Sequence, residues 1–277
     1  MEIKPEDRRA KLRTIRVGHV LGFPIGIHAS WFTILVLLTW VLAVSYYPVQ
    51  IQGWPSLQYW IAGGVTTILV FGGVLFHELG HAVVARHFQI RVRDITLFIF
   101  GGIAQIEGQP SSAVAEFWIA VAGPAMSLAM AGAFGLLQAV LTGFPFLSIP
   151  ARYLAYVNLS LALFNLIPGY PLDGGRVLRA VVWAVAGDMR RATLVAANVG
   201  RGVSFLLVVL GLWQVVVGNW ATGLWIAFIG WFLETAARGE LRRLEAKGLM
   251  ARPERWEATH PDCPRIPGGP RGEPGDA

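Results

Sequence analysis

Charged residues and cysteine are scarce in this chain. Lys, Arg, Asp and Glu together make up only 14% of the 277 residues, whereas soluble domains usually carry about 25%. Hydrophobic residues make up 55%, and the mean hydropathy is +0.54. This composition argues against a soluble globular domain and predicts an integral membrane protein. The single cysteine, Cys263, excludes both an intramolecular disulfide and a metal site built from cysteines.

Basic residues outnumber acidic ones, which gives a net charge of +6. In a soluble chain such an excess would suggest nucleic-acid binding. In a chain this apolar we instead expect Lys and Arg at the cytoplasmic edges of membrane spans, and we expect no nucleic-acid partner.

The sequence contains about six apolar stretches near the length that a helix needs to cross a bilayer. They are residues 29–47, 59–86, 113–141, 153–167, 192–217 and 220–237. Lys and Arg gather in alternate connections, which predicts a multi-pass protein of the cell (inner or plasma) membrane with both termini in the cytoplasm. We assign residues 1–237 to this membrane domain. Residues 238–277 are expected to form a cytoplasmic charged extension and a disordered Pro- and Gly-rich tail.

Two further features concern the ends and the shape of these spans. Glu116 and Glu234 lie near span ends, so we expect them at the membrane interface. Gly123 and Pro124 are expected to bend the third span or to permit close packing of helices there.

The sequence His77-Glu78-Leu79-Gly80-His81 lies inside the second apolar stretch. Histidines at positions i and i+4 lie on one face of a helix, one turn apart, where two imidazole nitrogens can meet one Zn²⁺. Glu78, next to the first histidine, can serve as general base toward a water that the metal activates. Ionisable groups are costly within a bilayer, so the apolar setting favours a functional site over a chance match.

A catalytic zinc site needs a third protein ligand and an open position. The other histidines are weak candidates, because His28 precedes the first span and His87 points off the ligand face of its helix. Asp173 follows a Pro- and Gly-rich break after the fourth span, at a depth where a carboxylate favours a cation. The alternative is a helix N-cap at Asp173; beside an intramembrane HExxH we favour the ligand.

Between the second and third spans, residues 94–110 are rich in β-forming apolar residues around Gly101-Gly102. We predict a small membrane-associated β-hairpin there. It is either a packed connector or, equally, a strand edge that receives substrate at Gly101, Gly102, Ile103 and Ala104. The predicted fold is therefore an all-α polytopic membrane protein of about six transmembrane helices with this one hairpin.

The motifs HELGH, FGGIAQ and FNLIPGYPLDGGR, in this order, resemble those of the site-2 proteases, a family of intramembrane zinc metalloproteases. The resemblance implies one zinc ion per chain, bound by His77, His81 and Asp173. It implies that Glu78 activates the water. It also assigns Asn165 to holding the substrate or the oxyanion.

The resemblance covers roughly residues 15–245 and is greatest for the six-span bacterial and archaeal branch. Residues 91–112 are too few for the PDZ domain that many members carry, and residues 238–277 are too few for a pair of CBS domains. The implied activity is cleavage of a transmembrane segment in regulated intramembrane proteolysis. The implied partners are the lipid bilayer and a membrane-tethered substrate, for example an anti-sigma factor or a signal-peptide remnant.

Two other functions remain open at this point. A metal transporter would explain the spans and the buried acid, but it gives no reason for a glutamate beside a ligand. A catalytically inactive scaffold that binds membrane helices would not need intact His77, Glu78, His81 and Asp173. The sequence leaves the oligomeric state open, and a homo-oligomer is compatible with it.

Overall fold

The computed structural model of the chain describes residues 14–99 and 101–246, with side chains up to residue 239. The predicted tail, which includes Cys263, lies outside the described residues. In chain order the elements are β1 (Thr14–Val20), β2 (Phe23–His28), α2 (Ser30–Val41), the π-helical turn η1 (Leu42–Tyr46), α3 (Tyr47–Gln50), α4 (Ser56–His87), β3 (Val92–Phe98), β4 (Gly101–Ile106), α5 (Ala113–Val140), α6 (Pro145–Asn165), α7 (Asp173–Ala186), α8 (Met189–Val216) and α9 (Trp220–Ala246).

Five helical segments are long and apolar enough to cross a membrane, and they match the first five predicted spans. They are Ser30–Gln50, Ser56–His87, Ala113–Val140, Pro145–Asn165 and Met189–Val216. The fourth begins at Pro145 rather than at residue 153, because a proline is well tolerated in the first turn of a helix.

The sixth predicted span, residues 220–237, is helical and forms the first part of α9. It is not among the five segments; its tryptophans and Glu234 make it less apolar than the others. The helix continues to Ala246, so it passes through the expected domain boundary at residue 237 without a break.

The predicted hairpin forms as β3 and β4, but it belongs to a larger sheet. Four strands pair in the order β1-β2-β3-β4. The chain before the first span supplies β1 and β2, which the sequence analysis did not predict. β2 and β3 run parallel, with Ile25 opposite Ile95, and the first two spans form the connection between them. The sheet leaves β4 as an edge strand.

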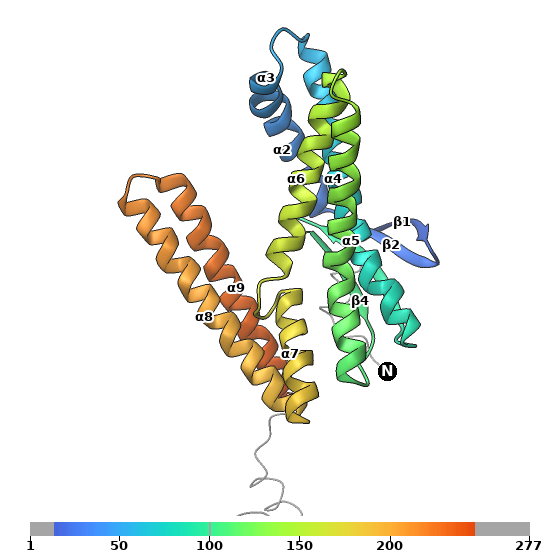
Figure 1. The fold of residues 1–277 in the computed structure, drawn as a ribbon, viewed down its shortest axis with the longest axis vertical. Coiled ribbons are helices and arrows are strands. Elements are labelled where there is room, and N and C mark those ends of the chain that lie inside the picture. Colours follow the sequence, from blue (N-terminus) through green and yellow to red (C-terminus); the bar gives the residue numbers. More distant parts are fainter. Residues whose placement is uncertain (1–13, 100, 247–277) are drawn as a thin grey trace, which may run out of the picture.

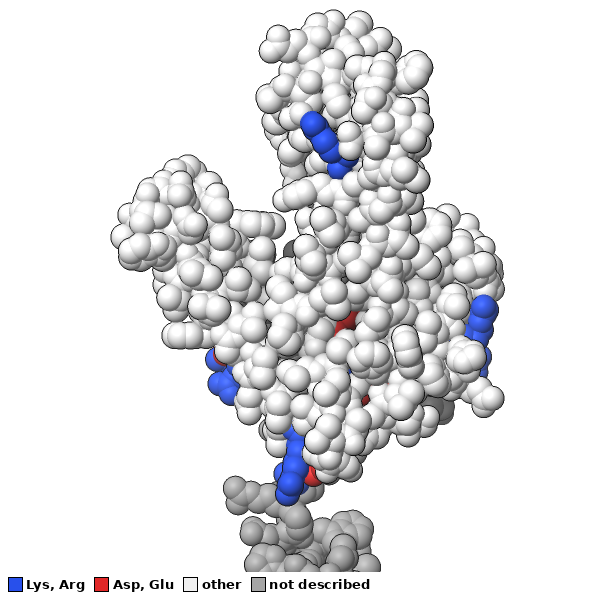
Figure 2. Space-filling model, viewed as in Figure 1, with Lys and Arg blue, Asp and Glu red and all other residues white. Residues whose placement is uncertain are grey.

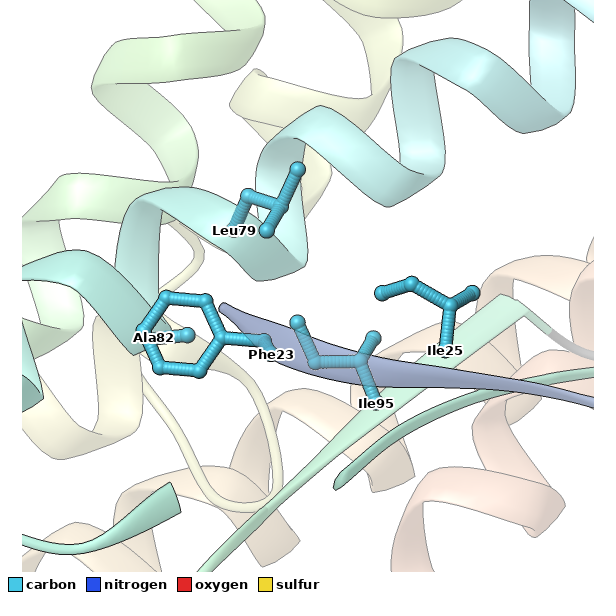
Figure 3. Packing of buried hydrophobic residues seen from close by; sticks show 5 residues of the cluster. All are labelled: Phe23, Ile25, Leu79, Ala82 and Ile95. Atoms are coloured by element: carbon cyan, nitrogen blue, oxygen red, sulfur yellow. The ribbon is translucent and has the colours of Figure 1, made fainter. Parts of the chain in front are cut away.

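The sheet packs against α4 beside the HExxH motif. Phe23, Ile25 and Ile95 from the sheet form a buried apolar cluster with Leu79 and Ala82 of α4 (Figure 3). Leu79 lies between the two histidines in sequence, and Ala82 follows the second. One face of α4 therefore carries the contact with the sheet, and another face presents the two histidines. The sheet is thereby fixed to the helix that bears the motif.

Helices α8 and α9 pack side by side through glycines. A Cβ at Gly211 would lie 2.5 Å from the backbone of Ala227, and one at Gly230 would lie 2.7 Å from the carbonyl oxygen of Ser204. Such close helix contacts are typical of membrane proteins. Figure 1 shows the pair leaning away from α4, α5 and α6, with α7 between them at the lower end.

Charged side chains are few and unevenly distributed on the surface. On the face drawn in Figure 2, most Lys and Arg lie in the lower half of the molecule, and the upper half is almost entirely uncharged. This distribution is the one expected of a membrane-embedded chain with one basic side.

Candidate active site

His77 and His81 lie one turn apart on α4, and both are almost fully buried, with 4% and 5% of their surface exposed. Their Nε2 atoms are 3.3 Å apart. Asp173 is the first residue of α7 and is also buried. Its Oδ2 atom lies 3.2 Å from each of the two Nε2 atoms. Residues separated by almost a hundred positions in sequence are thus brought into one triangle.

The helix-cap alternative for Asp173 is wrong. Leu172 occupies the N-cap position of α7 and no side chain caps the helix, so the Asp173 carboxylate is directed at the histidines instead. The other histidines considered lie elsewhere. Nδ1 of His28 lies 2.8 Å from the hydroxyl of Ser30, and His87 is exposed at the end of α4.

The triangle has the dimensions of one face of a tetrahedral zinc site. Zinc bonds to imidazole and carboxylate are about 2.0–2.1 Å long, which places two ligand atoms of a tetrahedron about 3.3 Å apart. The observed edges are 3.2, 3.2 and 3.3 Å. Three ligand atoms converge at this spacing among the described residues. Atoms that carry lone pairs repel one another when buried together, so the arrangement fits a cation.

Helix α5 orients both imidazoles from the opposite side. The Nδ1–H of His81 donates to the carbonyl oxygen of Ile119 at 2.6 Å. Nδ1 of His77 lies 2.9 Å from the hydroxyl of Ser127. Each Nδ1 is therefore engaged, which leaves Nε2 for a metal. Neither partner is predicted from the sequence, since a serine and a backbone carbonyl in an apolar span carry no recognisable motif.

Gly123 of α5 faces the same two rings. A Cβ at this position would lie 2.2 Å from Nε2 of His81 and 2.8 Å from Nε2 of His77. Only glycine allows α5 to approach this closely. Gly123 and Pro124 were expected to give a bend or close packing. Close packing is present at Gly123, and it occurs against the metal-binding atoms themselves.

Glu78 points from α4 to the edge strand β4. Its Oε2 accepts a hydrogen bond from the backbone N–H of Ala104 at 3.1 Å. A Cβ at Gly102 would lie 2.5 Å from Cγ of Glu78, so glycine is needed there for the side chain to fit. The predicted substrate strand and the predicted base are therefore in direct contact.

A cavity of about 340 Å³ opens between α4, β4, α6 and α7. Every predicted site residue lines it, namely His77, Glu78, His81, Gly101, Gly102, Ile103, Ala104, Asn165 and Asp173. The amide of Asn165 donates to the carbonyl oxygen of Leu161 at 3.0 Å, so one of its two N–H groups is already engaged. Arg176, which the sequence analysis did not select, also lines the cavity.

Glu116, which we expected at the membrane interface, has a buried partner on another helix. It is fully buried, and its Oε1 accepts hydrogen bonds from Nε and Nη2 of Arg179 on α7. The Arg179 guanidinium also lies over the ring of Tyr170, 5.3 Å from its centroid. A buried charge requires a buried partner, and the partner comes from the helix that begins with Asp173. The pair therefore joins α5 to α7, the helix that carries the third residue of the triangle.

Known proteins resemble this chain in sequence and in fold. Residues 65–153 and 145–209 match Peptidase family M50. Rip3 of Mycobacterium tuberculosis, named as a candidate zinc metalloprotease, is 44% identical over 240 residues, which cover 86% of this chain and 61% of Rip3. The candidate zinc metalloprotease sll0528 of Synechocystis is 39% identical over 261 residues, covering 92% of this chain and 67% of that protein.

The structure of a site-2 protease from Methanocaldococcus jannaschii aligns with a TM-score of 0.54 and 27% identity, over 82% of this chain and 94% of that one. This chain spans about three fifths of the length of Rip3. The shared fold, the matched segments and the two motifs that meet at the cavity agree, and the chain therefore belongs to peptidase family M50, the family of the site-2 proteases.

Proposed function

We propose that this protein is a zinc-dependent endopeptidase that hydrolyses a peptide bond in a transmembrane segment of a membrane-tethered substrate. The observation that carries the proposal is the triangle of Nε2, Nε2 and Oδ2 atoms, whose edges match a tetrahedral zinc site. A carboxylate, Glu78, lines the same cavity as the triangle. Family membership supports the same chemistry.

When bound, zinc would act as a Lewis acid on the scissile carbonyl and lower the pKa of the attacking water. Glu78 is placed to take the proton of that water and to pass it to the leaving amine. The N–H of Ala104 holds one oxygen of this carboxylate in place. Asn165, at the end of α6, has one amide N–H left to bind the substrate or the oxyanion.

Edge strand β4 is proposed to bind the substrate in extended form. Residues 101–104 of β4 line the cavity, and no other strand within residues 14–99 and 101–246 pairs with the far side of β4. A transmembrane helix shields its amides, so it must unwind locally before cleavage, and the freed backbone can then pair with an exposed edge. Glycine or proline in the substrate lowers the cost of this unwinding.

The basic residues support an orientation with both termini in the cytoplasm of the cell (plasma) membrane. His77 precedes Arg86, at the end of α4, by nine residues. At a rise of 1.5 Å per residue the site would lie about 13 Å inside the cytoplasmic boundary. Substrates compatible with this depth include an anti-sigma factor or a signal-peptide remnant, cut in regulated intramembrane proteolysis.

The test compares zinc content and cleavage in detergent-purified protein. We expect about one zinc per chain in the wild type, and cleavage of at least one substrate in a panel of single-span peptides that carry Gly or Pro in the span. His77→Ala should lose both zinc and cleavage, and Glu78→Gln should keep zinc and lose cleavage. His87→Ala is the matched control and should keep both, because His87 lies outside the cavity.

Other outcomes would contradict the proposal. Zinc uptake into proteoliposomes without any cleavage would favour a transporter. Binding of single-span peptides without cleavage by a zinc-loaded wild type would favour an inactive scaffold. A Glu78→Gln variant that cleaves like the wild type would remove Glu78 as the base.

A further inference from the structure

Arg176 lines the cavity, and its charge has no partner among the residues that the structure describes. It lies one helical turn after Asp173 on α7, so the two side chains project from the same face of that helix. Its side chain is half-buried, and it makes no hydrogen bond or ion pair with any residue that the structure describes. Arg179, one turn further along, is instead paired with Glu116.

The charges around the cavity show what Arg176 can bind. Asp173 and Glu78 contribute two negative charges, and neutral histidines contribute none. A bound Zn²⁺ balances the two carboxylates, so Arg176 leaves the site with one excess positive charge. A partly buried guanidinium favours an anion that it can reach by a charge-assisted hydrogen bond. The molecule that gains negative charge in this cavity during hydrolysis is the substrate itself.

We propose that Arg176 is a further catalytic residue, which donates to the carbonyl oxygen of the scissile peptide bond as that oxygen becomes negative. This role rests on the proposed protease function. Arg176 is the only lysine or arginine among the described residues that line the cavity. Asn165, the neutral donor nearby, has already given one N–H to Leu161. Arg176 therefore supplies the charged donor that the site otherwise lacks.

The oxygen of the water bonds to the carbonyl carbon, and its proton goes to Glu78. The electron pair of the carbonyl double bond moves onto the carbonyl oxygen, where Arg176 stabilises the new charge. The pair then returns, the carbon–nitrogen bond breaks, and the proton on Glu78 passes to the leaving amine. Stabilisation that is stronger in the transition state than in the ground state raises kcat more than it lowers KM.

The test uses Arg176→Gln and Arg176→Lys in the zinc-loaded protein, with a cleavable single-span peptide and a phosphinic analogue of the same peptide, which carries a tetrahedral anion in place of the scissile bond. We expect Arg176→Gln to keep one zinc per chain, to lose about 100-fold in kcat with little change in KM, and to lose a similar factor in affinity for the phosphinic analogue. Arg176→Lys should restore part of both losses.

Arg191→Gln is the matched control, because Arg191 is an exposed arginine whose ion pair with Asp188 lies at the start of α8. It should cleave and bind the analogue like the wild type. Unchanged kcat or unchanged analogue affinity in Arg176→Gln would overturn the role of Arg176 while leaving the protease intact. Loss of zinc in Arg176→Gln would overturn it too, because the residue would then be supporting the metal site. A wild type without zinc or cleavage would refute the proposed function itself.

Discussion

Replacing Gly123 by alanine should abolish zinc binding without unfolding the protein. The added Cβ would lie 2.2 Å from Nε2 of His81, 2.5 Å from its Cε1 and 2.8 Å from Nε2 of His77. Ordinary contacts between heavy atoms are about 3.5 Å or longer, so the His81 ring must move by about 1.3 Å. Zinc sites tolerate ligand displacements of about 0.2 Å. The displaced imidazole therefore ceases to be a ligand.

The cost to the fold should be small. A ring that turns away from the new methyl group loses the hydrogen bond from Nδ1 of His81 to Ile119, worth about 1 kcal/mol. Alanine in place of glycine within a helix returns about 1 kcal/mol. The two effects nearly cancel, so the metal-free variant should unfold at close to the denaturant midpoint of the metal-free wild type.

The assay is a chelator competition that gives the zinc affinity, run beside a denaturant titration in detergent. We expect Gly123→Ala to lose at least about 100-fold in zinc affinity. Removing only a residue that hydrogen-bonds to a ligand can already cost about 100-fold in metal affinity, and here a ligand itself is displaced. Gly132→Ala is the control, because it lies on the same helix and a Cβ there meets nothing within 4 Å. Wild-type zinc affinity in Gly123→Ala would refute the reasoning, since the two rings could then not lie where the structure places them.

Three other substitutions separate the parts of the site. Gly102→Ala should displace Glu78, because the new methyl group would lie 2.5 Å from Cγ of Glu78. The zinc content per chain should stay at the wild-type value while kcat falls about 100-fold. Full activity in this variant would contradict the placement of the base. Glu116→Gln leaves the Arg179 charge buried without a counter-charge. The free energy of unfolding, measured by denaturant titration in detergent, should fall by about 3–5 kcal/mol. An unchanged unfolding midpoint would show that the pair is not formed. Ser127→Ala removes the hydroxyl beside Nδ1 of His77. Chelator competition should show zinc binding weakened about 10-fold to 100-fold. A zinc affinity equal to that of the wild type would show that this hydroxyl does not orient the ring.

The parts of the site that the sequence predicted are those with a short, chemically unusual pattern. His77, Glu78 and His81 can be read together because a helix of known pitch fixes their relative positions. Asp173 stood out because a carboxylate after a Pro- and Gly-rich break in a membrane span needs a cation. The span positions followed from hydropathy, since a bilayer imposes one length on every crossing helix.

What the sequence did not show depends on long-range pairing. Strand β2 was missed because its partner β3 lies beyond two spans in the chain. Strand β1 pairs only with β2 and is mostly exposed, so it has no buried periodic face. The ion pair of Glu116 with Arg179 was not predicted, because the two residues lie on different helices and are 63 positions apart in the chain. A charged residue that is buried in an ion pair and one that faces the membrane interface cannot be distinguished from the sequence alone, because the partner of the buried charge is not known.

Helix α5 explains why the ligands alone do not determine the site. Glu116, Ile119, Gly123 and Ser127 recur at helical spacing, so they share one face of α5 and all are directed at α4 or α7. One face thus orients each imidazole, admits the metal-binding atoms at its glycine and fixes the helix that begins with Asp173. A change of register in α5 would disturb all of these contacts together. A sequence that kept the HExxH motif and Asp173 but lost this spacing would retain the ligands without the geometry that makes them a zinc site.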